Sequence, residues 1–162
     1  MAAVAPAIEN LTLSITQEIQ IRSSLDATFA ALLEQMGPAN ETHDGRPMPM
    51  TIESWPGGRW FRDLGGQNGH FWGHVQAIKR PTLLEITGPL MMSSPVISNV
   101  QYRLSAIEGG TLLTFRHTAL GLIPEGYREG LSLGWTHMLE GIRRRTEAAA
   151  QPTHETEADR WQ

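Results

Sequence analysis

The chain has 162 residues, of which 40% are hydrophobic and 19% charged, and this length suits one globular domain with a sizeable core rather than two. A formal net charge of -4 offers no basic surface to nucleic acid or to an anionic membrane, and the absence of cysteine excludes disulfides, thiolate metal sites and a cysteine nucleophile. No run approaches the roughly 18 apolar residues of a membrane span, and the first residues lack the basic start of a signal peptide. We therefore expect a cytoplasmic protein with no nucleic-acid and no membrane partner.

The first part of the chain predicts a strand followed by a short helix. Residues 11–22 alternate between apolar and polar side chains, which is typical of a strand with one buried face. Ser23 with Asp26 three positions later resembles a capping box, so we expect a helix that starts at Ser23 and stops at Gly37. Residues 39–47 are polar and rich in turn formers, and they predict an exposed loop. The apolar stripe of this helix consists of Phe29, Leu32, Leu33 and Met36.

The middle of the chain predicts a meander of six strands separated by turns rich in glycine and proline. Their expected ranges are 48–55, 59–64, 69–79, 82–88, 95–106 and 111–120. The strand at 95–106 alternates most clearly, which is typical of an antiparallel sheet with one covered face. Its inward side chains are predicted to be Val96, Ser98, Val100, Tyr102 and Leu104.

Residues 124–147 predict one long helix, with Pro124 at its first position because the missing N–H of proline would be unpaired there in any case. Its apolar stripe consists of Leu131, Trp135, Met138, Leu139 and Ile142. Four glycines interrupt it, each costing about 1 kcal/mol relative to alanine in a helix interior: Gly126, Gly130, Gly134 and Gly141. Two interpretations stay open, namely an irregular helix start that leaves the first two in a loop, or space under the helix for a strand or a ligand.

The order of these elements indicates the fold. A sheet of about seven strands can bury its inner face only if another element covers it, and the last helix has the length and the apolar stripe to do so. We predict an α+β protein in which a curved antiparallel sheet wraps around the long C-terminal helix, with a short helix after the first strand. The single domain is expected at 11–147, with flexible termini at 1–10 and 148–162.

Several short motifs occur in an order that resembles a known superfamily. They are Trp55-Pro-Gly-Gly-Arg-Trp60, the run GHFWGHV at 69–75, PTLLE at 81–85, GGTL at 109–112, and Gly134-Trp135 in the last helix. Together they resemble the START-like (SRPBCC, helix-grip) superfamily, and within it the activator of heat-shock-protein-90 ATPase homologue-like branch. The resemblance implies a cavity between sheet and helix for apolar or amphipathic small molecules such as lipids, sterols or polyketides. Some relatives are cyclases or hydrolases, and the branch takes its name from co-chaperones.

Histidines are the first candidates for chemistry. His70 and His74 should share one strand face with Trp72, but four residues along a strand separate them by about 13 Å, too far to share one metal ion. His117 follows the inward period of its strand, so it is either a core histidine with a backbone partner or a polar anchor in the cavity. His137 lies off the helix stripe, so we expect it to be exposed.

The leading hypothesis is a pocket that binds a hydrophobic or amphipathic small molecule without catalysis. Its predicted lining combines aromatic side chains, one thioether and one histidine: Trp55, Trp60, Trp72, Tyr102, Phe115, His117, Trp135 and Met138. We predict no catalytic residue, no metal ligand and no cofactor. The alternatives are a co-chaperone-type module that acts on a heat-shock ATPase, and a cyclase or hydrolase; a homodimer also stays open.

Overall fold

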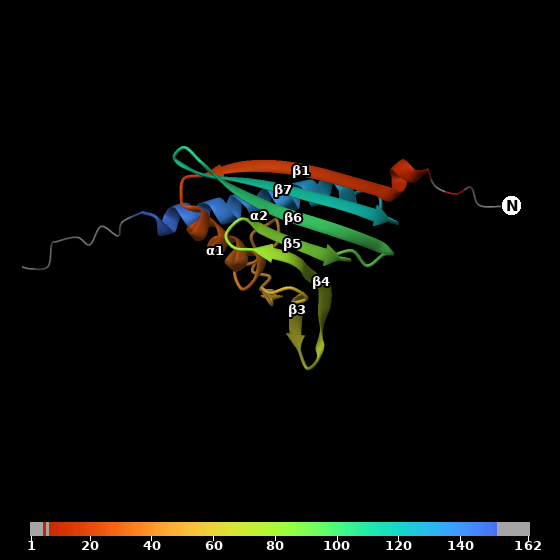
Figure 1. The fold of residues 1–162 in the computed structure, drawn as a ribbon. Helices are drawn as coiled ribbons and strands as arrows, with labels where there is room; N and C mark the ends of the chain where they lie inside the picture. Colours follow the sequence, from red (N-terminus) through yellow and green to blue (C-terminus); the bar gives the residue numbers. More distant parts are fainter. Residues whose placement is uncertain (1–4, 6, 152–162) are drawn as a thin grey trace, which may run out of the picture.

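A seven-stranded antiparallel sheet holds both α-helices of the described residues on one side (Figure 1). The structure is a computed structural model that describes residue 5 and residues 7–151. A short 3-10 helix at Ile8–Leu11 precedes the first strand. The other elements are β1 (Thr12–Ile21), α1 (Leu25–Met36), β2 (Thr51–Ile52), β3 (Arg59–Gly65), β4 (Asn68–Lys79), β5 (Leu83–Gly88), β6 (Val96–Ile107), β7 (Gly110–Gly121) and α2 (Tyr127–Ala149).

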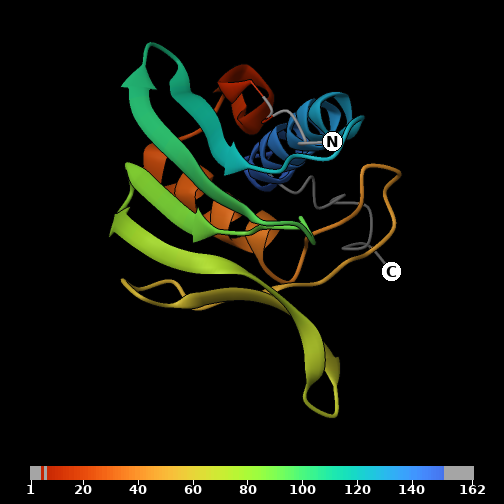
Figure 2. The ribbon, with the colours of Figure 1, turned by 90° about the vertical axis from the view of Figure 1, so that its right-hand side faces the viewer.

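The strand order is β1-β7-β6-β5-β4-β3-β2, so the first strand of the chain pairs with the last. This pairing runs from Thr12 opposite Leu120 to Ile21 opposite Thr111. Figure 2 shows α1 and α2 on the same side of the curved sheet, with the hairpin of β3 and β4 extending beyond them. α2 packs on α1 and on β1. The predicted α+β helix-grip architecture is therefore confirmed.

The core lies between the inner face of the sheet and the two helices. β6 alternates as predicted, since Val100 and Tyr102 are fully buried while Arg103 is exposed. On β7 the same period buries Leu113 and Phe115. Side chains of this kind dominate the favourable burial energy, at about 25 cal/mol per Å² of apolar surface removed from water. The sheet therefore forms one continuous wall of the core.

Two elements differ from the sequence-based expectation near α1. The helix begins at Leu25, and its N-cap is Ser24 rather than Ser23, because the Ser24 hydroxyl accepts a hydrogen bond from the backbone N–H of Ala27 at 3.2 Å. The strand expected at 48–55 shrinks to Thr51–Ile52. Prolines that lack a ladder donor stand just before it, at Pro47 and Pro49.

The long helix also starts later than predicted. Pro124 lies outside it, and the N-cap is Gly126, whose φ of 84° is a left-handed conformation that glycine adopts readily. The helix then continues to Ala149, and no helix among the described residues is long and apolar enough to cross a membrane. The flexible termini expected at 1–10 and 148–162 lie largely outside the described residues.

Candidate functional site

A pocket of about 550 Å³ lies beside α2, within the volume range of small-molecule sites. Three parts of the chain form its walls. The segment between α1 and β2 supplies Asn40, Glu41, Thr42, His43 and Met48, the sheet side supplies Trp72 and Met91, and α2 with its N-cap supplies Gly126, Tyr127, Gly130, Leu131, Gly134, Trp135 and Met138. One wall is therefore polar, and the others are mostly aromatic, aliphatic and thioether.

The helix glycines separate into distinct groups. A Cβ built on Gly130 or Gly134 would meet no heavy atom of the described residues within 4 Å, and both glycines line the pocket. A Cβ on Gly141 would instead lie 2.8 Å from the amide of Gln35, so this glycine lets α1 approach α2. Gly126 belongs to the turn before the helix. The irregular helix start therefore holds for Gly126 but not for Gly130, which lies inside the helix, and Gly141 makes room for a residue of α1 rather than for a strand.

A β-bulge brings Trp72 to the pocket. In the ladder between β3 and β4, Trp60 pairs with Gly73 and Phe61 pairs with Phe71, so Trp72 is an extra residue without an opposite partner. A bulge changes the direction of a side chain relative to its strand. Trp72 is accordingly only 7% exposed.

The histidines on either side of Trp72 do not follow it inward. His70 and His74 are exposed, so the prediction that all three side chains share one face is wrong. The Nδ1 atom of His74 lies 3.0 Å from the backbone oxygen of Gly57, outside the pocket. Within residues 5 and 7–151, no three histidine, aspartate or glutamate side chains gather in a way that could hold a metal ion.

The other predicted lining residues occupy two kinds of position. Trp60 and Tyr102 are fully buried behind the pocket wall, and both contact Met36: the Trp60 Nε1–H donates to its backbone oxygen at 2.7 Å, and the Tyr102 hydroxyl donates to its sulfur at 3.2 Å. Phe115 is also buried, with its ring centroid 4.6 Å from that of Trp135. Trp55 lies apart from the pocket in the turn before β3 and is 58% exposed.

His117 holds Trp135 in the pocket wall. The indole N–H of Trp135 donates to Nδ1 of His117 at 3.0 Å, and Nε2 of His117 lies 3.0 Å from the hydroxyl oxygen of Ser98. Because an indole nitrogen only donates, Nδ1 must carry the lone pair and Nε2 the proton. Burial lowers the pKa of His117 to about 4, so the ring is neutral at pH 7. His117 is thus a buried core histidine, but its hydrogen-bond partners are the side chains of Trp135 and Ser98 rather than the backbone group that was expected.

The contact between Ser98 and His117 resembles the serine–histidine pair of a hydrolase triad, but its hydrogen bond runs in the opposite direction, from the histidine to the serine. A histidine that activates serine must accept the hydroxyl proton on the nitrogen that faces it. Here that nitrogen already carries a proton, because Trp135 occupies the other one. Neither Ser98 nor His117 lines the pocket. This network therefore positions an indole rather than activating a nucleophile.

An ion-pair cluster ties the polar wall to α2. One carboxylate oxygen of Glu41 lies 2.8 Å from Nε2 of His137 and 3.3 Å from a guanidinium nitrogen of Arg144. His137 is half-buried by this contact, so the expectation of an exposed side chain is wrong. The loop expected to be exposed at 39–47 is exposed at residues 43–47, but Asn40 is buried and Glu41 and Thr42 are half-buried in the polar wall, for which the sequence carries no motif.

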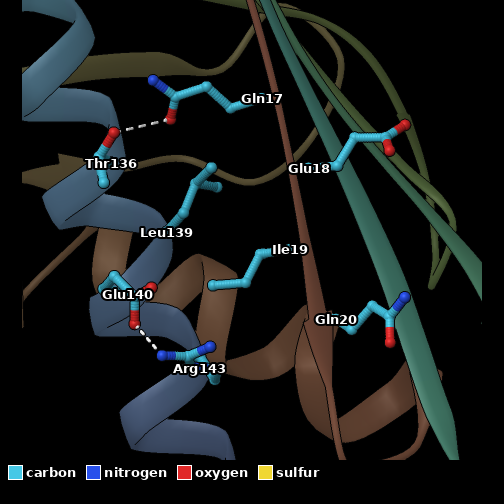
Figure 3. Close-up of a pocket in the computed structure, with 8 residues that line it drawn as sticks. All are labelled: Gln17, Glu18, Ile19, Gln20, Thr136, Leu139, Glu140 and Arg143. Atoms are coloured by element: carbon cyan, nitrogen blue, oxygen red, sulfur yellow. Dashed lines mark hydrogen bonds and ion pairs between the residues drawn. The ribbon is translucent and has the colours of Figure 1, made fainter.

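A second hollow, of about 530 Å³, runs between β1 and α2 (Figure 3). Gln17 and Ile19 point from β1 toward the helix, whereas the residues between and after them point away. Four of the polar side chains of this groove already pair with one another: the Gln17 amide accepts from the hydroxyl of Thr136, and Arg143 forms an ion pair with Glu140. We therefore regard the pocket with the glycines as the candidate site.

The fold recurs in solved structures of other proteins. A protein from Rhizobium leguminosarum is 16% identical over 85% of this chain and 95% of its own, with a TM-score of 0.66. The AHSA1-like protein from Aeromonas hydrophila is 19% identical over 88% of this chain and 97% of its own, with a TM-score of 0.60. The di-domain ARO/CYC StfQ from the steffimycin biosynthetic pathway is 13% identical, with a TM-score of 0.62, and the match covers 88% of this chain and 53% of StfQ.

No curated protein matches the sequence. The structural matches share the START-like fold at identities too low to transfer a ligand or an activity. The family model for "Activator of Hsp90 ATPase homolog 1-like protein" matches residues 39–147, which is more than half of the chain and contains all three walls of the pocket. This protein therefore belongs to the Activator of Hsp90 ATPase homolog 1-like family.

Proposed function

We propose that the pocket beside α2 binds an apolar or amphipathic small molecule without covalent chemistry. The observation that carries the proposal is the open space at Gly130 and Gly134. Each glycine costs the helix about 1 kcal/mol relative to alanine, and neither is needed for close packing. A ligand that occupies this space would explain both positions.

The chemistry of the walls supports the same class of ligand. Two indole rings, Trp72 and Trp135, and the thioethers of Met48, Met91 and Met138 border the space. Indoles offer broad apolar faces, and methionine side chains adapt their shape to irregular ligands. The hydrogen bond from Trp135 to a neutral, buried histidine keeps one indole in place before a ligand arrives, which lowers the ordering cost of binding.

A fluorescence titration with N-phenyl-1-naphthylamine, a neutral apolar dye, tests the proposal. We expect the wild-type protein to bind the dye and Gly134→Leu to weaken binding roughly tenfold, the equivalent of about 1.4 kcal/mol of apolar contact. Ala148→Leu places the same side chain at an exposed position of the same helix and serves as the matched control. Equal binding by all three proteins, or no binding by the wild type, would contradict the proposal.

A second candidate function is a protein-interaction module of the co-chaperone type. Its supporting observation is an apolar pair on the outer face of the sheet, where Ile97 of β6 stands opposite Leu120 of β7, with 59% and 53% exposure. Exposed apolar patches often mark interaction sites. A change in the ATPase rate of Hsp90 that disappears in Ile97→Ser would support this candidate, and an unchanged rate at saturating protein would remove it.

A further inference from the structure

The C-terminal segment of the chain, residues 152–162, carries one large apolar side chain. Its sequence is PTHETEADRWQ, in which Trp161 stands among polar, charged and small residues. The segment follows the end of α2 and lies outside the described residues. Tryptophan is enriched among the residues that dominate binding energy at interfaces, because its ring buries a large apolar area at a low cost in conformational entropy. Trp161 is therefore the one side chain of this segment suited to anchoring it on an apolar surface.

The segment is long enough to return to the pocket beside α2. The helix ends at Ala149, the backbone bends at Gln151, and the next residue is proline, which ends helices because it lacks the N–H. The pocket residues Met138 and Gly134 lie eleven and fifteen residues before that end, or about 17 and 23 Å at 1.5 Å per residue. Ten extended residues span up to about 33 Å, which is the reach of Trp161 from Gln151.

Opposite charges mark the route from the end of α2 to the pocket. The C-terminal segment contains one arginine and three carboxylates, those of Glu155, Glu157 and Asp159. On α2, Arg144 and Arg145 are exposed, and Arg145 forms no ion pair with any described residue. Arg144 contacts the carboxylate of Glu41, which lines the pocket, so the arginines lie between the end of the helix and the pocket. Opposite charges within a Debye length of about 8 Å attract one another, and the segment would meet them on this route.

The pocket offers surroundings that suit an indole ring. Two of its walls present aromatic rings, Trp72 and Trp135, and the thioether of Met138 lies beside them. Aromatic rings pack favourably on one another and on methionine sulfur. At Gly134 the helix leaves open space, since a Cβ there would meet no described heavy atom within 4 Å. The features that suit an apolar small molecule therefore suit a tryptophan side chain as well.

We propose that residues 152–162 return along Arg144 and Arg145 and place the indole of Trp161 in the pocket, where it competes with the small-molecule ligand. This inference rests on the proposed function, because it adds a regulator to the same site. A tethered segment acts at an effective concentration of about 1 mM. With a dissociation constant of about 0.25 mM for its docking, it weakens ligand binding about fivefold.

Titrations of full-length variants with N-phenyl-1-naphthylamine test this competition. We expect Trp161→Ser to bind the dye about fivefold more tightly than the wild type. Trp55→Ser is the matched control, because it also removes a tryptophan, one that is 58% exposed and outside the pocket, and it should leave the dissociation constant unchanged. Arg145→Glu repels the carboxylates of the segment and should tighten dye binding about twofold. Combined with Trp161→Ser, it should add nothing further.

The outcomes separate this inference from the proposed function. If the dye binds the wild type and Trp161→Ser equally well, the pocket stands and the docking of the C-terminal segment is overturned. In Gly134→Leu, where the added side chain occupies the open space, Trp161→Ser should have no effect; an undiminished effect would place Trp161 elsewhere and overturn the assignment. Dye binding by the wild type that weakens as the protein concentration rises would assign the segment to a second copy and overturn docking within one chain. If the dye binds none of these proteins, the proposed function fails, and the inference fails with it.

Discussion

Replacing the helix glycines one at a time with alanine tests whether the space beside α2 is empty. Gly130 and Gly134 lie inside the helix, and a Cβ at either position meets no described heavy atom within 4 Å. Gly130→Ala and Gly134→Ala should therefore each gain the full difference in helix propensity, about 1 kcal/mol, and the double variant about 2 kcal/mol. In a protein of this size, 1 kcal/mol raises the melting temperature by roughly 2–4 °C.

Two other glycines of the same series provide matched controls. Gly141→Ala has the same propensity gain, but its Cβ must displace the buried amide of Gln35, which donates to the backbone oxygen of Ala39 at 3.4 Å. Losing a buried hydrogen bond of this kind costs about 1–3 kcal/mol, so we expect no net stabilisation. Gly126→Ala forces a non-glycine residue to a φ of 84° and should destabilise by roughly 1 kcal/mol.

Urea unfolding, followed by tryptophan fluorescence, measures all four variants. We expect stabilisation at the two pocket positions and none at the other two. Similar changes in the free energy of unfolding for all four substitutions, or a pocket variant less stable than the wild type, would refute the presence of empty space at Gly130 and Gly134. Stabilised variants that also bind the dye more weakly would connect the glycines directly to the pocket.

Two further perturbations address the groups around the pocket. Burial lowers the pKa of His117 to about 4 in the folded protein, against an ordinary value of 6.5. As the pH falls, the unfolded chain therefore takes up a proton at this residue before the folded protein does. The contribution of His117 to the free energy of unfolding is fully present above pH 6.5, and about 3 kcal/mol of it is lost by pH 4. Urea unfolding of the wild type and His117→Gln between these pH values should show that extra slope in the wild type alone, and parallel curves would contradict it. Glu41→Gln weakens the contacts with His137 and Arg144, and it should speed amide hydrogen exchange across residues 40–48 while changing global stability by less than about 1 kcal/mol. Unchanged exchange in that segment would show that these contacts do not hold the loop.

Much of the fold could be predicted because its signals are local. The alternation of β6 predicted its buried face, and the three- and four-residue spacing from Leu131 to Ile142 predicted the stripe of α2. The ends of elements were less predictable, since Ser23 and Ser24 are chemically equivalent caps, and only the geometry of the chain selects Ser24. Pro124 suited a first helical position but lies outside the helix, because the turn closes at Gly126.

The candidate site was predictable only in part. The apolar period of α2 identified Trp135 and Met138, which do line the pocket. Trp72 was named on the assumption of regular alternation, whereas a bulge in its pairing with β3 directs its side chain inward. Asn40 was assigned to an exposed loop, because a polar stretch without periodicity carries no sign of what will lie next to it.

By itself, then, the sequence determined the features that depend on neighbours along the chain: strand and helix periods, the glycine-rich turns and the α+β order. Only the tertiary structure decided the features that depend on distant partners. The four glycines of the last helix look alike in sequence, yet one forms a turn, two face open space and one admits Gln35. Likewise, the protonated nitrogen of His117 follows from Trp135 and Ser98, which come from two other elements. Side-chain surroundings arise when elements pack together, and no local period encodes them.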